Sequence, residues 1–360
     1  MTTTSDGTAQ DAMPLSWRRF IALVVGVSLG LGLAVVAFVA AMDPYGLHAA
    51  AGRRAGPLMD SNQRFMYPQV VRSGAYDAAV FGTSTARLLD PVDLDRTFGG
   101  HFANLAMNAA TPFEQVEMAR LFLRHASPRT ILWGLDRNWC EADADTRRFT
   151  FRPFPSWLYT EGTPLGALRQ VNWQSLAAAS AVLLHRVGKA PVRLRGDGYA
   201  VFTPPEASYD AARAALHIHG GRTALPDAAG DPDSAPRAAS DPEAMPALAW
   251  LDDTLAALPP TTAAIVAFMP AHVAAQGAPG TPMATREAAC KAHVAEIGRR
   301  RGALVVDFRI PSPVTREDTN YWDALHYRLP IAARIVAALG AARAKTADAS
   351  DGFYSVLSRP

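Results

Sequence analysis

From Tyr76 onward, short apolar runs alternate with longer stretches whose apolar residues recur at helical spacing. The runs at 78–81, 130–135, 263–269 and 303–308 are typical of buried strands. The stretches at 111–125, 174–186, 285–301 and 329–342 are typical of helices that bury one face. Parallel strands need long crossover connections, usually helices. The alternation therefore predicts an α/β domain with a mainly parallel sheet covered on both faces.

The second strong feature is an uncharged, apolar run from Phe20 to Met42, which follows closely on Arg18 and Arg19. A helix over this run would be long enough to cross the ~30 Å hydrocarbon core of a bilayer. Arginines before the run favour a cytoplasmic N-terminus, so the body of the protein would lie outside the cytoplasm. We predict an uncleaved, single-pass signal anchor in the inner (cytoplasmic) membrane. The alternative is a cleaved signal peptide, whose apolar core is usually shorter, about 7–15 residues.

The chain therefore divides into an anchor, a connector and one large domain. The expected segments are a disordered cytoplasmic tail at 1–16, a transmembrane signal anchor at 17–42, a connector at 43–74, the α/β domain at 75–345 and a C-terminal tail at 346–360. Within the domain, residues 221–245 are rich in Ala, Asp, Pro, Gly and Ser and show no apolar period. Such a composition predicts a flexible insertion.

Composition and residue spacing argue against several other functions. The formal net charge is only +2, so nucleic-acid binding is not expected. His217 and His219 are metal-ligand types, but no Cys or carboxylate is spaced to complete a site, so no metal is predicted. The two cysteines, Cys140 and Cys290, are too few for a disulfide framework. We expect two unpaired thiols packed as small apolar groups, with a single bridge as the alternative if the domain is exported.

A serine and a histidine lie near opposite ends of the predicted domain. The first predicted strand ends in Gly82-Thr83-Ser84, a small-residue turn that presents a serine. Near the C-terminus, Asp323 precedes His326 by three residues, a spacing at which a carboxylate can fix the tautomer of an imidazole ring. A serine hydroxyl is a poor nucleophile until a base removes its proton. We therefore predict a catalytic triad of Ser84, His326 and Asp323.

A triad that transfers acyl groups also needs hydrogen-bond donors for the oxyanion of the tetrahedral intermediate. Backbone N–H groups after Gly82 are candidates, because glycine lets the chain approach closely. Asn104 and Asn108 precede a predicted helix and Asp136 follows a predicted strand, which places all three near one edge of the sheet. The amides would donate to the oxyanion, and Asp136 would orient the substrate. The alternative for each of the three is an ordinary turn or cap residue.

These motifs resemble the SGNH (GDSL-like) hydrolase superfamily. The resemblance is to its membrane-anchored, exported members related to alginate O-acetylation proteins and the teichoic-acid D-alanyl-transfer protein. Phe81-Gly82-Thr83-Ser84 matches the nucleophile block, Asp323-Ala324-Leu325-His326-Tyr327 matches the final block, and Asp43-Pro44-Tyr45-Gly46 looks like the membrane-exit segment. The resemblance spans roughly residues 43–342. It implies a three-layer α/β/α, flavodoxin-like fold of the SGNH type, with Ser84 as nucleophile, His326 as base and Asp323 as its partner.

The chain departs from the family pattern at two points. Thr83 stands where the usual Gly-Asp-Ser has its Asp. The family's oxyanion Gly and Asn blocks have no clean match, so Asn104, Asn108 or the segment 134–138 would have to replace them. These departures leave two functions open on the same fold, an active enzyme and a catalytically inactive binding module.

The function that the resemblance implies is an exported, membrane-tethered serine esterase or O-acyltransferase. Its acyl group would be acetyl, and its substrate a cell-surface or secreted polysaccharide or another acylated polymer. No cofactor is expected. A transferase would work with a multi-spanning membrane acyltransferase as partner, because the acyl donor must cross the membrane. The alternative is a catalytically inactive SGNH-like scaffold that binds polysaccharide or an assembly partner.

Overall fold

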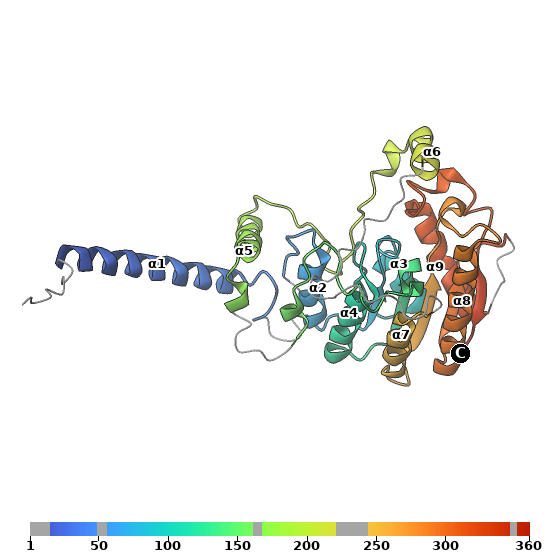
Figure 1. Cartoon of the computed structure of the whole chain (residues 1–360), viewed down its shortest axis with the longest axis horizontal. Coiled ribbons are helices and arrows are strands. Elements are labelled where there is room, and N and C mark those ends of the chain that lie inside the picture. Colours follow the sequence, from blue (N-terminus) through green and yellow to red (C-terminus); the bar gives the residue numbers. More distant parts are fainter. Residues whose placement is uncertain (1–14, 49–55, 161–167, 221–243, 346–350) are drawn as a thin grey trace, which may run out of the picture.

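The computed structural model describes residues 15–48, 56–160, 168–220, 244–345 and 351–360. A long helix, α1 (Leu15–Met42), projects from an α/β body that holds the rest of the described chain (Figure 1). Over Ser16–Met42 this helix is long and apolar enough to span a membrane, and none of its most apolar stretch is buried. The expected tail at 1–16 and insertion at 221–245 lie almost entirely outside the described residues.

The sheet of the body has six strands among the described residues. They are β1 (Ala78–Phe81), β2 (Phe102–Asn104), β3 (Thr130–Leu135), β4 (Ala263–Phe268), β5 (Leu304–Asp307) and β6 (Ser355–Ser358). Their order is β2-β1-β3-β4-β5-β6, with the first five parallel and β6 antiparallel to β5. The predicted α/β class and mainly parallel sheet are confirmed, and the four predicted strands agree to within one residue at each end.

The sequence pattern did not reveal the two strands at the ends of this order. β2 has three residues and β6 has four, which is too short for a period to be visible. β6 corrects the expected C-terminal tail at 346–360, because Val356 pairs with Val306 and Ser355 pairs with Asp307. Backbone pairing with β5 therefore gives the last residues a fixed place at the sheet edge.

The described residues contain eight further α-helices. They are α2 (Gln63–Arg72), α3 (Pro91–Phe98), α4 (Pro112–His125), α5 (Trp173–Arg186), α6 (Ala211–His219), α7 (Ala247–Ala256), α8 (Pro282–Arg301) and α9 (Leu329–Ala344). α4 begins where the sequence indicates: the Thr111 hydroxyl accepts from the Glu114 N–H, and the Glu114 carboxylate accepts from the Thr111 N–H. α2 lies in the expected connector at 43–74, but all of its residues except Arg72 are buried, so this segment belongs to the body.

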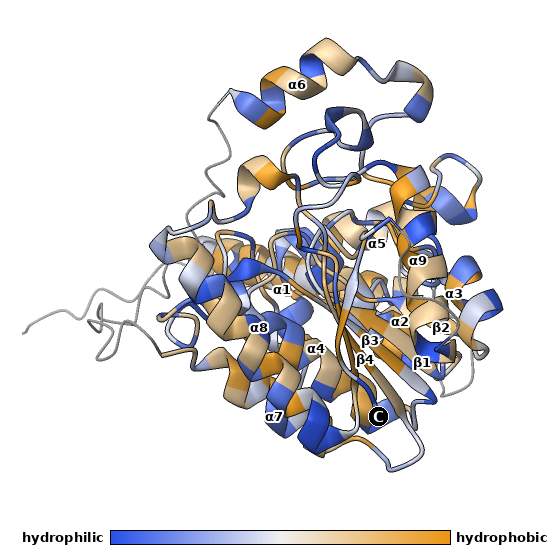
Figure 2. Ribbon diagram, turned by 90° about the vertical axis from the view of Figure 1, so that its right-hand side faces the viewer, coloured by the Kyte–Doolittle hydropathy of each residue, from blue (hydrophilic) through white to orange (hydrophobic). Residues whose placement is uncertain are grey.

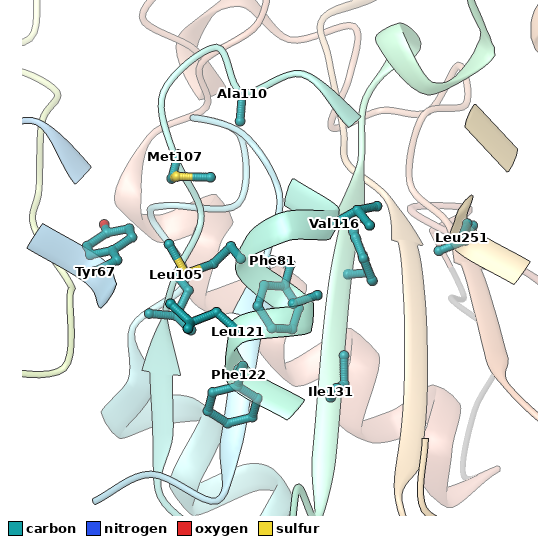
Figure 3. Packing of buried hydrophobic residues seen from close by; sticks show 14 of the residues in the cluster. Tyr67, Phe81, Leu105, Met107, Ala110, Val116, Leu121, Phe122, Ile131 and Leu251 are labelled. Carbon is teal, nitrogen blue, oxygen red and sulfur yellow. The ribbon is translucent and has the colours of Figure 1, made fainter. Parts of the chain in front are cut away.

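Two apolar cores lie on the two faces of the sheet, because successive side chains of a strand point to opposite faces. Phe81 and Trp133 belong to the core that α4, α7 and α8 cover, whereas Val80 and Leu132 belong to the core that α3 and α9 cover. The rings of Phe81 and Phe122 of α4 meet edge-on, with centroids 6.0 Å apart (Figure 3). The strands are largely hydrophobic, and the helices around them carry hydrophilic residues as well (Figure 2).

Cys140 and Cys290 form a disulfide bond that spans 150 residues of sequence. Cys140 ends a short 3₁₀ turn, Arg137–Cys140, which follows β3, and Cys290 lies in α8. The expectation of two unpaired thiols is therefore wrong. Spacing along the chain could not show the pairing, because only the packing of α8 against the turn after β3 brings the two residues together.

Candidate active site

The candidate site lies at the carboxyl ends of β1 and β3. The strand order reverses here, because the chain places β2 on one side of β1 and β3 on the other. Ligands of open α/β sheets bind in the crevice at such a switch point. Ser84 follows β1 and Asp136 follows β3, which puts two of the predicted site residues at this point.

Gly82 makes the turn after β1 tight. Its φ angle is +150°, and a Cβ at this position would lie 2.8 Å from the Cβ of Ala86 and 2.9 Å from the carbonyl oxygen of Gly134. A side chain here would therefore push the turn away from β3. The Gly82 carbonyl also accepts a 3.0 Å hydrogen bond from the N–H of Met107, which ties the loop after β2 to the same turn.

The structure brings Ser84, His326 and Asp323 into one hydrogen-bonded chain. Ser84 Oγ lies 2.9 Å from His326 Nε2, although the two residues are 242 positions apart in sequence. His326 Nδ1 lies 2.7 Å from Asp323 Oδ2. The other carboxylate oxygen of Asp323 accepts the backbone N–H groups of Leu325 and His326, at 2.8 and 2.9 Å. The three predicted triad residues thus have the geometry that the prediction requires.

The environment of Asp323 determines which ring nitrogen of His326 carries a proton. Burial raises the pKa of the carboxyl group, but hydrogen bonds and charge attraction from His326, together with two backbone N–H donors, outweigh burial and lower it overall. An ionised carboxylate only accepts hydrogen bonds, so His326 Nδ1 carries the proton that it shares with Asp323. A ring with its proton on Nδ1 presents the lone pair of Nε2 to the Ser84 hydroxyl, which is the tautomer that a general base needs.

Asp136 holds the turn that carries Ser84. Its carboxylate accepts the hydroxyl groups of Thr83 and Thr85, and its Oδ1 pairs with the buried guanidinium of Arg309 at 2.9 Å. Arg309 also donates to the carbonyls at the ends of β3 and β4. With its oxygens engaged by protein groups, Asp136 positions the nucleophile turn, which corrects the expectation that it orients substrate. Sequence reasoning missed Arg309, which belongs to no recognisable motif.

Asn104 is fully engaged inside the protein. It is 1% exposed, and its Nδ2 donates to the carbonyls of Ala86, Arg87 and Leu89 at 3.0, 3.3 and 2.8 Å. Its Oδ1 accepts the N–H of Ala106 at 3.1 Å. The expectation that Asn104 donates to an oxyanion is therefore wrong, because its donors already fix the chain that follows Ser84.

Asn108 lies on a loop that is held on several sides. Its N–H donates to Gln63 Oε1 at 3.3 Å, and its carbonyl accepts from the buried Arg64 at 3.1 Å. Its Oδ1 accepts a hydrogen bond from Arg87 at 2.8 Å. Because a guanidinium can only donate, this contact fixes which end of the amide is the oxygen and which is the N–H₂ group. Ala109 next to it has a φ of +52°, which costs energy for a non-glycine residue and is typical of functional loops. Of the two predicted amides, only Asn108 keeps its N–H₂ group outside these contacts.

Aromatic side chains pack against the loop that carries His326. The ring of Phe202 meets that of His326 edge-on, with centroids 5.4 Å apart, and the guanidinium of Arg87 lies 4.8 Å from the centroid of Phe202. Tyr209 packs edge-on against Trp322, next to Asp323, at 5.2 Å. The segment that carries Phe202 and Tyr209 therefore covers the histidine loop. Nothing in the sequence pattern marked it, because isolated aromatic residues in a loop carry no spacing signal.

Among the residues that the structure describes, no group of three or more His, Cys, Asp or Glu side chains is placed to hold a metal ion. His219 instead pairs with Asp318, with Nε2 3.0 Å from Oδ2. Asp318 also lies 3.1 Å from Nε2 of the buried His272, whose Nδ1 accepts the N–H of Ala274. A ring that accepts at Nδ1 carries its proton on Nε2, so His272 faces the carboxylate with a donor.

The arrangement at the switch point has the parts that acyl transfer requires: a hydroxyl on a tight turn, a base in the correct tautomer and an ionised carboxylate behind it. No family model matches the chain, and no curated protein sequence matches it.

Proposed function

We propose that this protein is an exported, membrane-anchored serine esterase or O-acyltransferase that acts on a cell-surface or secreted polysaccharide. The observation that carries the proposal is the hydrogen-bonded chain from Ser84 through His326 to Asp323 at the switch point of the sheet. A triad of hydroxyl, imidazole and carboxylate is recognised by this geometry and by the roles of its groups, not by sequence position.

In the proposed reaction, Ser84 Oγ attacks the carbonyl carbon of an acyl donor while His326 Nε2 takes the hydroxyl proton. The tetrahedral intermediate collapses, the bond to the leaving alcohol breaks, and His326 returns the proton to that alcohol. Ser84 then carries the acyl group as an ester. Water or a sugar hydroxyl attacks this ester with His326 again as base, which gives hydrolysis or transfer. Asp323 stabilises the imidazolium that forms in each half-reaction.

The oxyanion of that intermediate needs donors on the side of Ser84 opposite the histidine. We assign this role to the Nδ2 group of Asn108 and to backbone N–H groups of the turn after Gly82. The amide of Asn108 is oriented by Arg87, a guanidinium that is 3% exposed and belongs to no ion pair among the described residues. An unpaired buried cation beside the oxyanion position would further favour negative charge there.

Two features support the SGNH type within the α/β class. The order β2-β1-β3-β4-β5 is that of flavodoxin-like sheets. The departure at Thr83 also has a physical explanation. A carboxylate is absent from the middle position of the Gly-Asp-Ser pattern, but Asp136, at the end of the neighbouring strand β3, provides one that accepts a hydrogen bond from the hydroxyl of Thr83. The acetyl group and the polysaccharide remain parts of the proposal that rest on the family resemblance.

The proposed location is the inner membrane, with the catalytic body outside the cytoplasm. α1 supplies an apolar helix of sufficient length, preceded in the same helix by Arg18 and Arg19. The disulfide between Cys140 and Cys290 supports an oxidising compartment, since such bonds are rare in the cytosol. A multi-spanning acyltransferase in the same membrane is the partner that a transferase would need.

The test is the intact mass of the full-length protein, in detergent, after incubation with a fluorophosphonate. We expect one adduct on the wild type, none on Ser84→Ala and strongly slowed labelling of His326→Ala. His219→Ala is the matched control, because His219 also pairs with a carboxylate but faces no serine. It should label like the wild type. No adduct on a folded wild type would overturn the proposal and favour the inactive scaffold, for which the engagement of Asn104 by main-chain carbonyls is a structural argument.

A further inference from the structure

Helix α5 is largely apolar on the face that it exposes as well as on the face that it buries. From Trp173 to Leu184 it contains no charged residue. Its buried positions, Ser175, Ala178, Ala179 and Val182, face the protein. Its exposed positions include Trp173 and Leu184, with 81% and 46% of their surface accessible, and the residue that caps its C-terminal end, Val187, is 56% accessible. A helix that is apolar all round is normally covered on all sides, so the exposed face of α5 needs an occupant.

The exposed residues form a stripe at helical spacing. Positions 173, 177, 184 and 187 are exposed and apolar, and they follow one another by three, four or seven residues, which places them on one side of the helix. Leu183 widens the stripe, with 40% of its surface accessible. Trp173 at one end is the kind of residue that concentrates at the boundary between lipid and water.

The position of α5 identifies the occupant. α5 packs against the C-terminal turns of α1, where Val39 is only 3% exposed, although the rest of α1 is mostly exposed. Arg186 at the end of α5 donates to the carbonyl of Met42 at 3.3 Å, and the hydroxyl of Ser175 donates to that of Tyr45 at 3.2 Å. Figure 1 shows α5 running across the axis of α1 where α1 enters the body. With α1 spanning the membrane as proposed above, a helix that crosses its end would lie along the membrane surface.

We infer that α5 is an interfacial helix, whose stripe of Trp173, Leu183, Leu184 and Val187 is embedded in the phospholipid surface beside α1. The inference rests on the membrane attachment proposed above and is independent of the catalytic chemistry. Interfacial helices bury an apolar face about 5–10 Å into the boundary between headgroups and acyl chains. The exposed cations Lys189 and Arg193 follow the stripe, where they would meet the phosphate groups of the headgroups. The body is then held to the bilayer at two places.

The test places a single nitroxide label on the full-length protein in phospholipid vesicles and measures its collisions with oxygen, which partitions into lipid, and with a water-soluble nickel complex. An introduced cysteine is the only free thiol, because the chain has two cysteines and they pair with each other. The labelled variants are Leu184→Cys on α5, Leu29→Cys on α1, which is 64% exposed, and Leu216→Cys on α6, which is 68% exposed. Leu216 is the matched control, since α6 lies at the far end of the body from α1 (Figure 1).

The expected result is that labels at positions 184 and 29 collide readily with oxygen and are shielded from nickel, whereas position 216 collides readily with nickel. If the label at 184 is as accessible to nickel as the label at 216 while the label at 29 is in lipid, α5 is not an interfacial helix, although α1 still spans the membrane. A label at 184 that is shielded from both reagents would show that a second copy of the protein covers the stripe, which also overturns the inference. If the label at position 29 is accessible to nickel, α1 does not span the membrane, and both the proposed anchor and the interfacial helix are wrong.

Discussion

The two sides of the candidate site are stabilised in opposite ways. The orientation of Asp323 and His326 is set within their own loop: Asp323 Oδ1 accepts two N–H groups of that loop, and the N–H of Trp322 donates to the carbonyl of His326 at 2.8 Å. From outside, the N–H of His272 donates to the carbonyl of Ala324 at 2.9 Å. The turn that carries Ser84 is held from elsewhere in the sequence. Asp136 and Asn104 bind it from neighbouring strands, and the hydroxyl of Tyr327 donates to the carbonyl of Thr85.

This difference separates what a motif encodes from what a fold encodes. The geometry of the histidine loop depends on residues two or three positions apart, so a short motif carries most of it. The geometry of the nucleophile turn depends on residues 15 or more positions away, so the same short motif elsewhere would be an ordinary turn. Mutations on the two sides should therefore affect different quantities: the rate for the histidine loop, and the folding free energy together with the rate for the nucleophile turn.

The largest effect is expected for Asp323→Asn. The amide no longer favours the proton on His326 Nδ1, so the ring turns the wrong tautomer toward Ser84, and in serine hydrolases such a change costs about 10⁴-fold in kcat. The measurement is the rate of fluorophosphonate labelling or of ester hydrolysis. Asp318→Asn is the control, because Asp318 pairs with His219 away from Ser84 and should leave the rate unchanged. Near-normal labelling of Asp323→Asn would show that this carboxylate does not orient the base.

Asp136→Ala should be the variant that most destabilises the fold. It removes the acceptor of the Thr83 and Thr85 hydroxyls and leaves the guanidinium of Arg309, 6% exposed, without its nearest carboxylate. Orphaning one member of a buried ion pair costs about 3–5 kcal/mol of unfolding free energy. Urea unfolding of the full-length protein in detergent checks this value.

Asp252→Ala provides the matched comparison, since Asp252 pairs with Arg300 and Arg301 at the surface. Exposed pairs contribute about 0–1 kcal/mol, so this variant should unfold almost as the wild type does. An equal loss in the two variants would mean that the network behind the nucleophile turn is no stronger than a surface ion pair.

The α/β class, four strands and the pairing of Asp323 with His326 were readable from the sequence because each depends on a local pattern. Buried parallel strands such as Thr130–Leu135 are continuous apolar runs, and the spacing of Asp323 and His326 is fixed by their own loop. The end strands were not readable, because β6 has four residues and gains its stability only by pairing with β5. The disulfide and the role of Arg309 were likewise hidden, since each joins segments that only the folded sheet brings together.

The two asparagines were indistinguishable in sequence and differ in structure. Asn104 ends β2 and Asn108 follows it. The Nδ2 group of Asn104 donates to three carbonyls, whereas, within the described part of the chain, the side chain of Asn108 is bound only through its Oδ1, which accepts from Arg87. An oxyanion donor must have a free N–H, and only the tertiary contacts show which amide has one. Sequence reasoning could name the candidates and had no means to choose between them.

Asn108→Ala and Asn104→Ala convert this difference into a test. Removing an oxyanion donor costs about 10²–10³-fold in kcat, so Asn108→Ala should lower the rate by that factor with little change in substrate KM. Asn104→Ala should lower the unfolding free energy by about 1–3 kcal/mol, because buried carbonyls lose their donor. Rates and urea unfolding of both variants separate the two roles. A rate loss confined to Asn104→Ala would return the oxyanion role to that residue.

The smallest effect is a difference in pH dependence between two carboxylates. The folded-state pKa of Asp323 lies below the ordinary value of 3.8, so its ionised form contributes stability that is present above that value and is lost as pH falls through the folded pKa. Burial raises the pKa of Asp307, despite its pairing with Lys291, so the wild type loses stability as pH rises from 3.8 through the raised pKa. The margin of the wild type over Asp323→Asn should therefore shrink on acidification, and its margin over Asp307→Asn should grow. Urea unfolding between pH 3 and pH 7 measures both differences in unfolding free energy. If the two differences change in the same direction with pH, His326 does not stabilise the charge on Asp323.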